Sequence, residues 1–284
     1  MYKQWCPYCN AKGKYYFKIN SEFFFKCLIC DLIYKKDRSN SEKVVNKYKN
    51  EYFDNYGYSE ISGKRNNVYL EMIKSIEKKT QKGKILDVGT GCGFFLKIAR
   101  ERGWKVKGID PSIKSVKIAR RNNCPYVYKG TLKEYTNTEL FDVITFINAL
   151  DHSAHPWAEI EKSKNLLKPG GLIFLRFSNG LLHSAMYNLF RTFSLTKKVH
   201  ELVVFHEYSF TPKFIKKLLR ESGLYNIIIL NSPSTISAID FMQTERTLKS
   251  ILNVIYSFFA IAIKYITFNQ IILGTSLLVI AKKA

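Results

Sequence analysis

The chain is poor in acidic residues and has no segment typical of a secretory signal. Of its 284 residues, 23 are Asp or Glu and 45 are Lys or Arg, which gives a formal net charge of +22. A charge of this sign favours nucleic acid, anionic lipid or acidic substrates as partners. The basic residues form no long block, so a general richness in lysine explains the charge better than a dedicated basic surface. Because residues 1–9 lack an apolar core, we expect a cytoplasmic protein.

An apolar run long enough to span a bilayer is also missing. The most apolar stretch covers residues 250–268, and Lys264 divides it, so that roughly 14 uncharged residues stand where about 20 are needed. Its apolar positions fit one face of a helix: Ile251, Ile255, Phe258, Phe259 and Ala262. We therefore expect an amphipathic or docked helix, which together with the basic charge would permit peripheral contact with a membrane.

Cysteine is scarce, yet four of the six cysteines form two C-x-x-C pairs. In a cytoplasmic protein such residues are free or metal-bound rather than disulfide-paired. The four are Cys6, Cys9, Cys27 and Cys30. Short strands expected at residues 15–19 and 22–26 separate the pairs, and a segment this short needs a metal to fold. We predict that residues 1–38 form a zinc ribbon, with one structural Zn²⁺ bound by the four thiolates.

The centre of the chain has the pattern of a buried strand, a glycine turn and a helix. The turn reads D-x-G-x-G-x-G: Asp87, Gly89, Gly91 and Gly93. A helical apolar pattern begins at Phe94. A second strand, at residues 105–109, is followed by Asp110, about 20 residues past the glycines, where a carboxylate usually binds the hydroxyls of a nucleotide ribose. The pattern predicts a ligand that contains adenosine.

Two alternatives remain for this motif: a glycine turn without a ligand, and a dinucleotide site. Dinucleotide sites read G-x-G-x-x-G and place a pyrophosphate on the helix N-terminus. An acid two residues before the first glycine is unfavourable beside a pyrophosphate and suits an ammonium group. The motif, followed by GIDPS at residues 108–112, resembles that of the class I S-adenosylmethionine-dependent methyltransferases. The LLKPGG-LIFL succession at residues 166–175 is a further signature of that family.

The resemblance implies an α/β fold with a Rossmann-like sheet of seven strands. Most strands would be parallel, the last one antiparallel, and helices would cover both faces. The methyltransferase domain would span residues 83–284, with a substrate-side insertion over the mouth of the crevice at 180–205 and an apolar helical insertion at 232–272. Residues 39–82 would form a helical lid or linker. Its aromatic residues would either cover the cofactor or simply pack: Tyr48, Tyr52, Phe53 and Tyr58.

The resemblance also implies a binding site for S-adenosylmethionine at the ends of the first four strands of this sheet. Its residues would be Asp87, Gly89, Thr90, Gly91, Gly93, Phe94, Asp110, Pro111, Ser112, Thr131, Leu132, Asn148 and Ala149. Members of the family often have an acid after the third strand, beside the adenine. This chain has Thr131 and Leu132 there, and Glu134 follows slightly later.

Two histidines are candidates for the methyl-transfer chemistry. Asp151 and His152 match an acid–His pair that the family has after the fourth strand. His152 could act as a general base on a substrate hydroxyl, because imidazole titrates near neutral pH, or it could only cap a helix or orient the loop. His206 begins the segment HEYSFTP, which is similar to a segment of the family, and is the second candidate.

The chain lacks the signatures of methyltransferases that act on nucleic-acid bases. After the fourth strand, Asn148 is followed by Ala149, Leu150 and Asp151, so no N-P-P-Y tetrapeptide is present there. Neither Cys92 nor Cys124 stands where a nucleophile for cytosine C5 is needed. We therefore expect methyl transfer to oxygen or carbon of a small-molecule, glycan or lipid-like acceptor, with the resemblance leaning to ubiquinone-type, glycan or natural-product methylation. The alternative is an RNA-modifying or nucleic-acid-binding protein that uses the ribbon and the basic surface. A zinc-bearing scaffold with a vestigial site is a third hypothesis.

Overall fold

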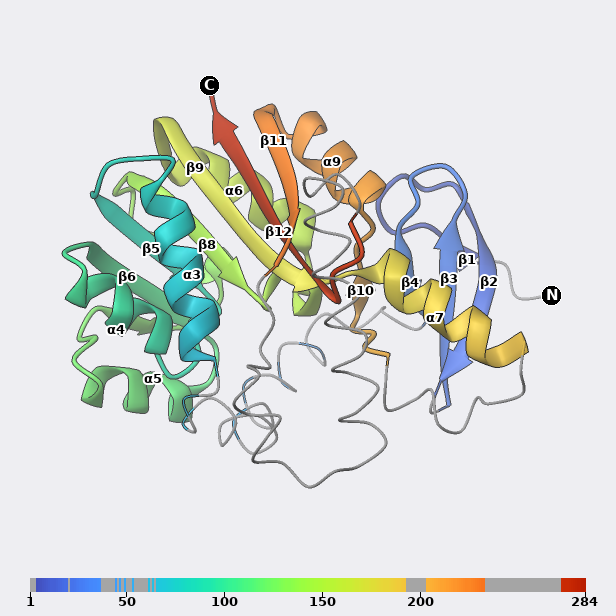
Figure 1. The fold of residues 1–284 in the computed structure, drawn as a ribbon, viewed down its shortest axis with the longest axis horizontal. Helices are drawn as coiled ribbons and strands as arrows, with labels where there is room; N and C mark the ends of the chain where they lie inside the picture. The colour runs from blue at the N-terminus through green and yellow to red at the C-terminus, as the bar shows by residue number, and fades with distance from the viewer. Residues whose placement is uncertain are drawn as a thin grey trace.

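The protein contains two sheets that differ in size and composition. The computed structural model describes residues 4–19, 21–36, 65–192, 203–232 and 272–284, together with isolated positions between residues 44 and 63. One sheet has seven strands and is flanked by helices. The other has five strands and is formed mainly by the N-terminal segment (Figure 1).

The seven-stranded sheet is mixed. Its strands are β5 (Lys84–Val88), β6 (Lys105–Asp110), β7 (Val127–Lys129), β8 (Phe141–Ile147), β9 (Leu167–Ser178), β11 (Leu224–Asn231) and β12 (Ser276–Lys283). They lie in the order β11-β12-β9-β8-β5-β6-β7. Neighbours from β9 to β7 are parallel, and β12 runs antiparallel to both β9 and β11. This confirms the predicted Rossmann-like sheet, mostly parallel with an antiparallel last strand.

The central strands are apolar on both faces, as strands between two layers of helices must be. In β5, for example, Ile85 and Leu86 are fully buried on opposite faces. The LLKPGG-LIFL succession at residues 166–175 lies mostly within one strand. β9 begins at Leu167, so it includes the two glycines of this succession. A shift in the pairing register between β8 and β9 accommodates the extra residues.

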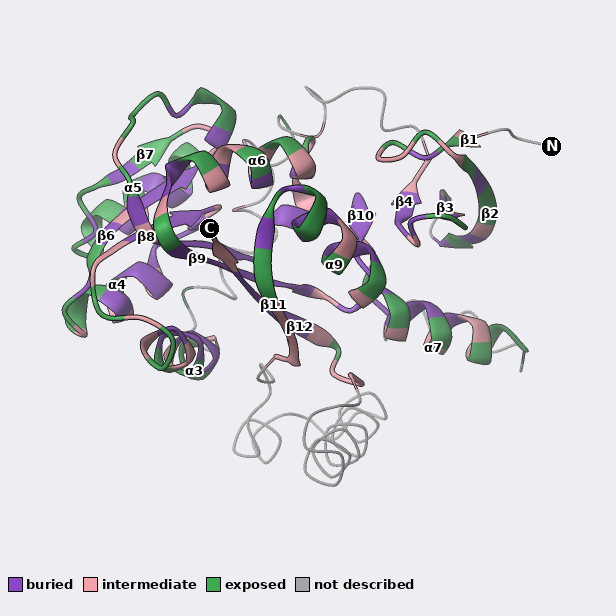
Figure 2. Cartoon of the chain, turned by 90° about the horizontal axis from the view of Figure 1, so that it is seen from above, coloured by how far each residue is buried: buried purple, intermediate pink, exposed green. Residues whose placement is uncertain are grey.

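Helices cover both faces of this sheet (Figures 1 and 2). On one face lie α3 (Asn66–Glu77), α4 (Phe94–Glu101) and α5 (Ile113–Arg121), and on the other lie α6 (Pro156–Leu166) and α9 (Pro212–Glu221). Each helix buries one apolar side. The start of α9 follows the sequence signal, because the Thr211 hydroxyl accepts the N–H of Phe214 at 3.1 Å and Pro212 occupies the first turn.

The N-terminal sheet is antiparallel and curled (Figure 2). Its strands are β1 (Gln4–Trp5), β2 (Lys12–Ile19), β3 (Glu22–Cys27), β4 (Ile33–Lys35) and β10 (Tyr208–Ser209), in that order. The fifth strand comes from a segment between α7 (Gly180–Thr192) and α9: Tyr208 pairs with Tyr34, and Ser209 pairs with Ile33. The N-terminal segment therefore shares its sheet with a segment that follows it by more than 170 residues in the sequence.

The first part of the predicted insertion at residues 180–205 forms α7 (Gly180–Thr192), which runs along the N-terminal sheet (Figure 1). The ring of Tyr187 lies 4.6 Å from that of Phe17, and the Tyr187 hydroxyl donates to the carbonyl of Lys18 at 3.0 Å. Tyr187 is thus buried against this sheet, and the position of the insertion over the crevice stays a prediction.

Several sequence predictions concern residues outside the described part of the chain. These are most of the lid at 39–64, with Tyr48, Tyr52 and Tyr58, residues 193–202, and residues 233–271, which include the apolar stretch at 250–268. Among the helices in the described ranges, none has the length and apolar character that a bilayer crossing requires.

Candidate functional site

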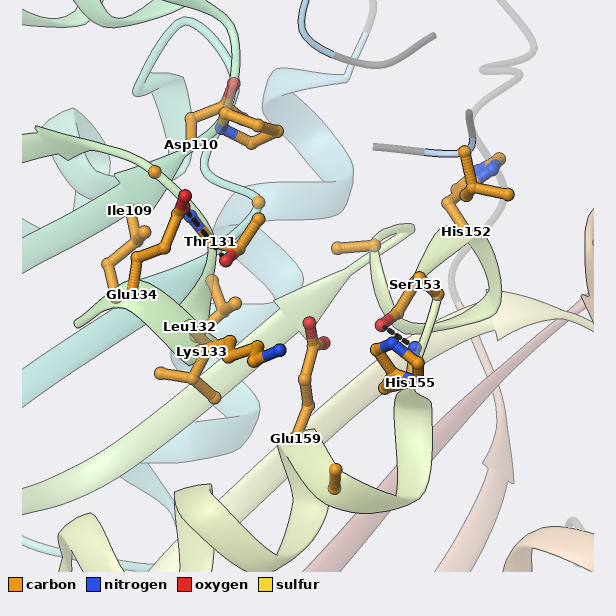
Figure 3. Close-up of a pocket in the computed structure, with 18 of the residues that line it drawn as sticks. Ile109, Asp110, Thr131, Leu132, Lys133, Glu134, His152, Ser153, His155 and Glu159 are labelled. Carbon is orange, nitrogen blue, oxygen red and sulfur yellow. Dashed lines mark hydrogen bonds between the residues drawn. The ribbon is translucent and has the colours of Figure 1, made fainter. Parts of the chain in front are cut away.

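A cavity of about 1060 Å³ opens at the carboxyl ends of the parallel strands. It is lined by the segments that follow β5, β6, β7 and β8, by α6, and by residues 44, 46 and 49 from the segment before α3 (Figure 3). Open α/β sheets bind ligands in this position, where loops from several strands converge. The predicted adenosine site and this cavity therefore coincide in the fold.

The turn after β5 has its shape because of Gly89, whose φ is +73°. Glycine adopts this left-handed conformation without steric cost. A Cβ at this position would lie 2.5 Å from the Cβ of Ala149, at the end of β8. Any larger residue would therefore displace the loop that follows β8 and crowd the cavity wall that the two residues share.

Asp110, at the end of β6, is oriented by this turn and is only 4% exposed. Its Oδ2 accepts the N–H of Gly91 and its Oδ1 accepts the N–H of Ser112, both at 2.8 Å. A carboxylate has about four acceptor positions, so it can also take hydroxyl groups of a ligand. Asp87 differs, because it is 2% exposed, lies outside the cavity lining and accepts the Thr145 hydroxyl at 2.6 Å.

The turn after β7 closes on itself through a capping box. A 3₁₀ helix, η1 (Leu132–Glu134), begins after Thr131. The Glu134 carboxylate accepts two hydrogen bonds from Thr131, one from its backbone N–H at 2.6 Å and one from its hydroxyl at 3.0 Å. These bonds lower the pKa of Glu134. The acid that follows the third strand is thus bonded to its own turn.

Three titratable side chains meet beside the cavity: Asp151, His152 and His206. Of these, Figure 3 shows His152, across the cavity from Asp110. His152, the last residue of η2 (Leu150–His152), lines the cavity, and its ring centroid lies 3.8 Å from that of His206. His206 Nε2 lies 3.8 Å from Asp151 Oδ2, which is an ion-pair distance and longer than a hydrogen bond. Burial raises the pKa of the Asp151 carboxyl to about 7. The ligand atoms of the three residues lie within 4.8 Å of one another, a spacing that a divalent cation can bridge.

A buried arginine supports the end of β8. The N–H of Asn148, whose φ is +53°, donates to the carbonyl of Arg176 at 2.7 Å. Arg176 Nη1 donates to Asn148 Oδ1 at 2.5 Å, and its Nε donates to Ser232 Oγ at 2.8 Å. Burial lowers the pKa of Arg176 to about 10. No sequence pattern predicts a role for Arg176, because one arginine in an apolar strand forms no motif.

The structure brings about half of the predicted site residues to the cavity wall. Those that line it are Gly89, Asp110, Pro111, Thr131, Leu132, Asn148, Ala149 and His152. Those that do not are Asp87, Thr90, Gly91, Gly93, Phe94, Ser112 and His206. Sequence reasoning missed Glu159 and Lys162, which line the cavity from α6. A helix between two strands gives no sequence signal that one of its sides faces a ligand.

The four cysteines of the C-x-x-C pairs form a second candidate site, at one end of the N-terminal sheet. Their sulfur atoms lie within 4.8 Å of one another, with Cys6 and Cys30 3.6 Å apart and Cys9 and Cys27 3.5 Å apart. A disulfide needs about 2 Å. A tetrahedron with Zn–S bonds of about 2.3 Å has edges of about 3.8 Å, so the donor set fits a metal ion.

Comparison with known proteins assigns the larger sheet to a family. A family described as a methyltransferase domain matches residues 63–228, which is more than half of the chain. The chain is 27% identical over 190 residues to the ubiquinone biosynthesis O-methyltransferase of Hydrogenovibrio crunogenus, covering 63% of this chain and 77% of that relative. It is 34% identical over 114 residues to the protein of the same name from Haemophilus ducreyi, covering 36% and 48%. The chain belongs to the methyltransferase domain family and is an S-adenosylmethionine-dependent methyltransferase.

Solved structures agree on the fold. A SAM-dependent methyltransferase from Archaeoglobus fulgidus superposes with a TM-score of 0.53 at 19% identity, covering 82% of this chain and all of that one. The plantazolicin methyltransferase BamL, solved with a triazolic desmethylPZN analog and SAH, gives a TM-score of 0.54 at 14% identity, covering 87% and 96%. At these identities the likeness establishes the fold of this chain.

Proposed function

We propose that the protein transfers a methyl group from S-adenosylmethionine to a hydroxyl of a small-molecule acceptor. The observation that supports this most is the continuous cavity between Asp110 and His152. It combines a carboxylate suited to a ribose with an imidazole suited to a hydroxyl proton. The relatives named as ubiquinone biosynthesis O-methyltransferases support an oxygen acceptor.

We propose the following roles for the cofactor residues. When bound, the sulfonium cofactor supplies an electrophilic methyl group. Asp110, whose carboxylate accepts the N–H groups of Gly91 and Ser112, would also accept the ribose hydroxyls. Asp87, behind the glycine turn, would add negative charge near the amino-acid end of the cofactor. Thr131, with Leu132, would border the base.

The remaining predicted cofactor residues would act through the shape of the two turns. These are Gly89, Thr90, Gly93, Phe94 and Pro111, with Asn148 and Ala149 on the far wall. The absence of side chains at the glycines would let the ligand reach the backbone N–H groups. The proposed site therefore needs the backbone geometry of these residues more than their chemistry.

In the proposed mechanism His152 takes the proton of the acceptor hydroxyl. Methyl transfer needs an oxygen nucleophile aligned with the reacting carbon, and removal of its proton raises its reactivity. His206, against the His152 ring and near Asp151, would orient that ring and stabilise its charged form. Both histidines thus take part in the proposed chemistry, with His152 in contact with the acceptor.

The experiment that tests the function measures transfer of a labelled methyl group into a cell extract, followed by identification of the product. The variant His152→Gln should lower kcat by about 10²–10⁴-fold, the usual contribution of general base catalysis. Its affinity for S-adenosylhomocysteine, measured by calorimetry, should stay unchanged. A product methylated on nitrogen or on RNA would contradict the proposal, and so would full activity of the variant. Repetition in the presence of EDTA separates proton abstraction from a role of a bound cation.

We propose further that the four cysteines bind one structural Zn²⁺ and that residues 1–38 form a zinc module around it. In this division of the chain, residues 39–82 form a lid and residues 83–284 form the methyltransferase domain. The sulfur–sulfur distances and the burial of Cys6, Cys27 and Cys30 support the metal site.

A peripheral membrane contact through residues 250–268 remains a prediction, because these residues lie outside the part of the chain that the structure describes. Sedimentation of the protein with anionic vesicles tests this contact.

A further inference from the structure

Glu159 is a cavity residue without a role in the mechanism above. It lies in the first turn of α6 and lines the same cavity as Asp110 and Thr131. Figure 3 shows its carboxyl pointing into the cavity, between the turn at residues 131–133 and the loop at residues 153–155. A carboxyl group in this position is available to a ligand.

Few groups of the protein stabilise the charged form of the Glu159 carboxyl. A hydrogen bond with Ser153 favours its charged form, but desolvation outweighs this bond and raises the pKa of Glu159 to about 7. Lys162, one turn further along α6, would be the natural ion-pair partner. Its ammonium group instead donates to the carbonyls of Lys133, at 3.0 Å, and Tyr135, at 2.6 Å.

The geometry of the sheet indicates which part of the cofactor reaches Glu159. If Asp110 binds the ribose, the amino-acid end extends over the glycine turn after β5, on one side of β6. The base then extends to the other side, toward β7, whose following turn at residues 130–134 lines the cavity. The space on that side lies between this turn and α6. Glu134, the acid on the turn itself, is bonded to Thr131.

We propose that Glu159 recognises the adenine of S-adenosylmethionine by pairing with its amino group and N1. The inference rests on the proposed cofactor site and names a residue of it. Adenine presents a donor, the amino group, next to an acceptor, N1. A protonated carboxyl offers one acceptor and one O–H donor in matching positions, whereas a carboxylate offers acceptors only.

Several titratable and charged side chains line the cavity together with Glu159, whose own protonation state decides whether this pairing forms. They come from the lid, β6, η1, η2 and α6: Lys49, Asp110, Lys133, Glu134, His152, His155 and Lys162. Glu159 is protonated below pH 7 and loses the proton as the pH rises through that value. The donor to N1 is therefore lost above neutral pH, and affinity for the cofactor should decline there.

The test is calorimetric titration of the full chain with S-adenosylhomocysteine and with its 1-deaza analogue, which lacks the N1 acceptor. The wild type should prefer the normal compound by about tenfold, the value of one hydrogen bond with a well-matched partner. Glu159→Leu should bind S-adenosylhomocysteine about 10–100-fold more weakly and lose the preference. Glu159→Gln has an acceptor and a donor at all pH values, so it should keep the preference and bind equally well from pH 6 to 8.

The matched control is Glu161→Leu, on the same helix but exposed and paired with Lys164 at 3.4 Å. It should behave as the wild type in every titration. A Glu159→Leu variant that retains both affinity and preference would overturn the inference while leaving the proposed function intact. A wild type that binds neither compound would overturn the cofactor site itself, and the inference with it.

Discussion

The two sheets of this protein are stabilised in different ways. The seven-stranded sheet is buried between helices by aliphatic side chains, with Ile144, Leu175 and Val279 all at 0% exposure. The five-stranded sheet has only a small cluster of its own with α7, which includes Phe17 and Phe24, whereas Phe25 and Cys27 belong to the core that also contains Ile144 and Leu175. The first can fold by burial of apolar surface alone, whereas the second is too small to do so. The comparison suggests that one sheet depends on a metal and the other does not.

The two sheets are nevertheless joined. The backbone N–H of Lys35 donates to the carbonyl of Glu207 at 3.2 Å, next to His206, and β10 continues the N-terminal sheet from there. Tyr208 also contacts the ring of Trp157 on α6. The catalytic candidate His206 therefore lies at the junction of the two sheets, while the cofactor candidates lie within one of them.

The largest expected effect follows from removing the metal. Cys27→Ser should lower the zinc content from about one ion per chain to none, because three ligands do not complete a structural site. Structural zinc contributes on the order of 10 kcal/mol to small modules, so the N-terminal sheet should become sensitive to protease. The affinity for S-adenosylhomocysteine should change by less than about threefold. The value of kcat should fall, because His206 lies next to Glu207, which bonds to the N-terminal sheet. Metal analysis, limited proteolysis and calorimetry measure the three effects.

The control for this variant is Cys124→Ser, a buried cysteine outside the N-terminal sheet. It should keep its zinc and its resistance to protease. Wild-type protein without zinc would show that the sulfur atoms gather for another reason. Loss of cofactor binding in Cys27→Ser would show that the two sheets depend on each other more closely than we expect.

The second prediction concerns the larger sheet. Asp110→Ala removes the acceptor for a ribose and for the N–H groups of Gly91 and Ser112. Charge-assisted hydrogen bonds contribute roughly 1.5–3 kcal/mol each, so affinity for S-adenosylhomocysteine should fall at least about 100-fold. Calorimetry measures the affinity, and circular dichroism should show an intact fold. Unchanged affinity would mean that the ligand lies elsewhere.

The contrast between the sheets also explains what could be predicted from the sequence. The strands and helices around the larger sheet follow local periodicity, and the strand expected at residues 105–109 is observed at Lys105–Asp110. The strand Tyr208–Ser209 has no such pattern, because two residues join a sheet only where the fold brings them to its edge. The surface that α7 contacts likewise exists only in the folded N-terminal sheet, so the sequence of Gly180–Thr192 does not identify it.

The candidate cofactor site also contains residues that a motif predicts and residues that only the fold brings together. The glycine turn and Asp110 form a motif of fixed spacing and were predicted. Arg176 donates to Asn148, and Glu159 lines the same cavity as the turn at 130–134, so both lie beside residues far away in the sequence, and no motif spacing predicts them. Motifs identify the groups that a ligand requires in every member of a fold. The groups that differ between members become visible only in the folded chain.

The smallest expected effect tests the junction itself. Tyr8, within the first C-x-x-C pair, places its ring 5.5 Å from Trp157 and 5.2 Å from Phe214, and its hydroxyl donates to Glu221. Tyr8→Ala removes two aromatic contacts of about 0.5–1.5 kcal/mol each and part of the buried area, so it should lower the free energy of unfolding by about 2 kcal/mol. Tyr8→Phe keeps the ring contacts and should lower it by less than about 1 kcal/mol. Urea unfolding followed by tryptophan fluorescence measures both. If the sheets share a core across Tyr8, the wild type should unfold in one transition. Separate transitions, with Tyr8→Ala and Tyr8→Phe equally stable, would show that β10 alone joins the two sheets.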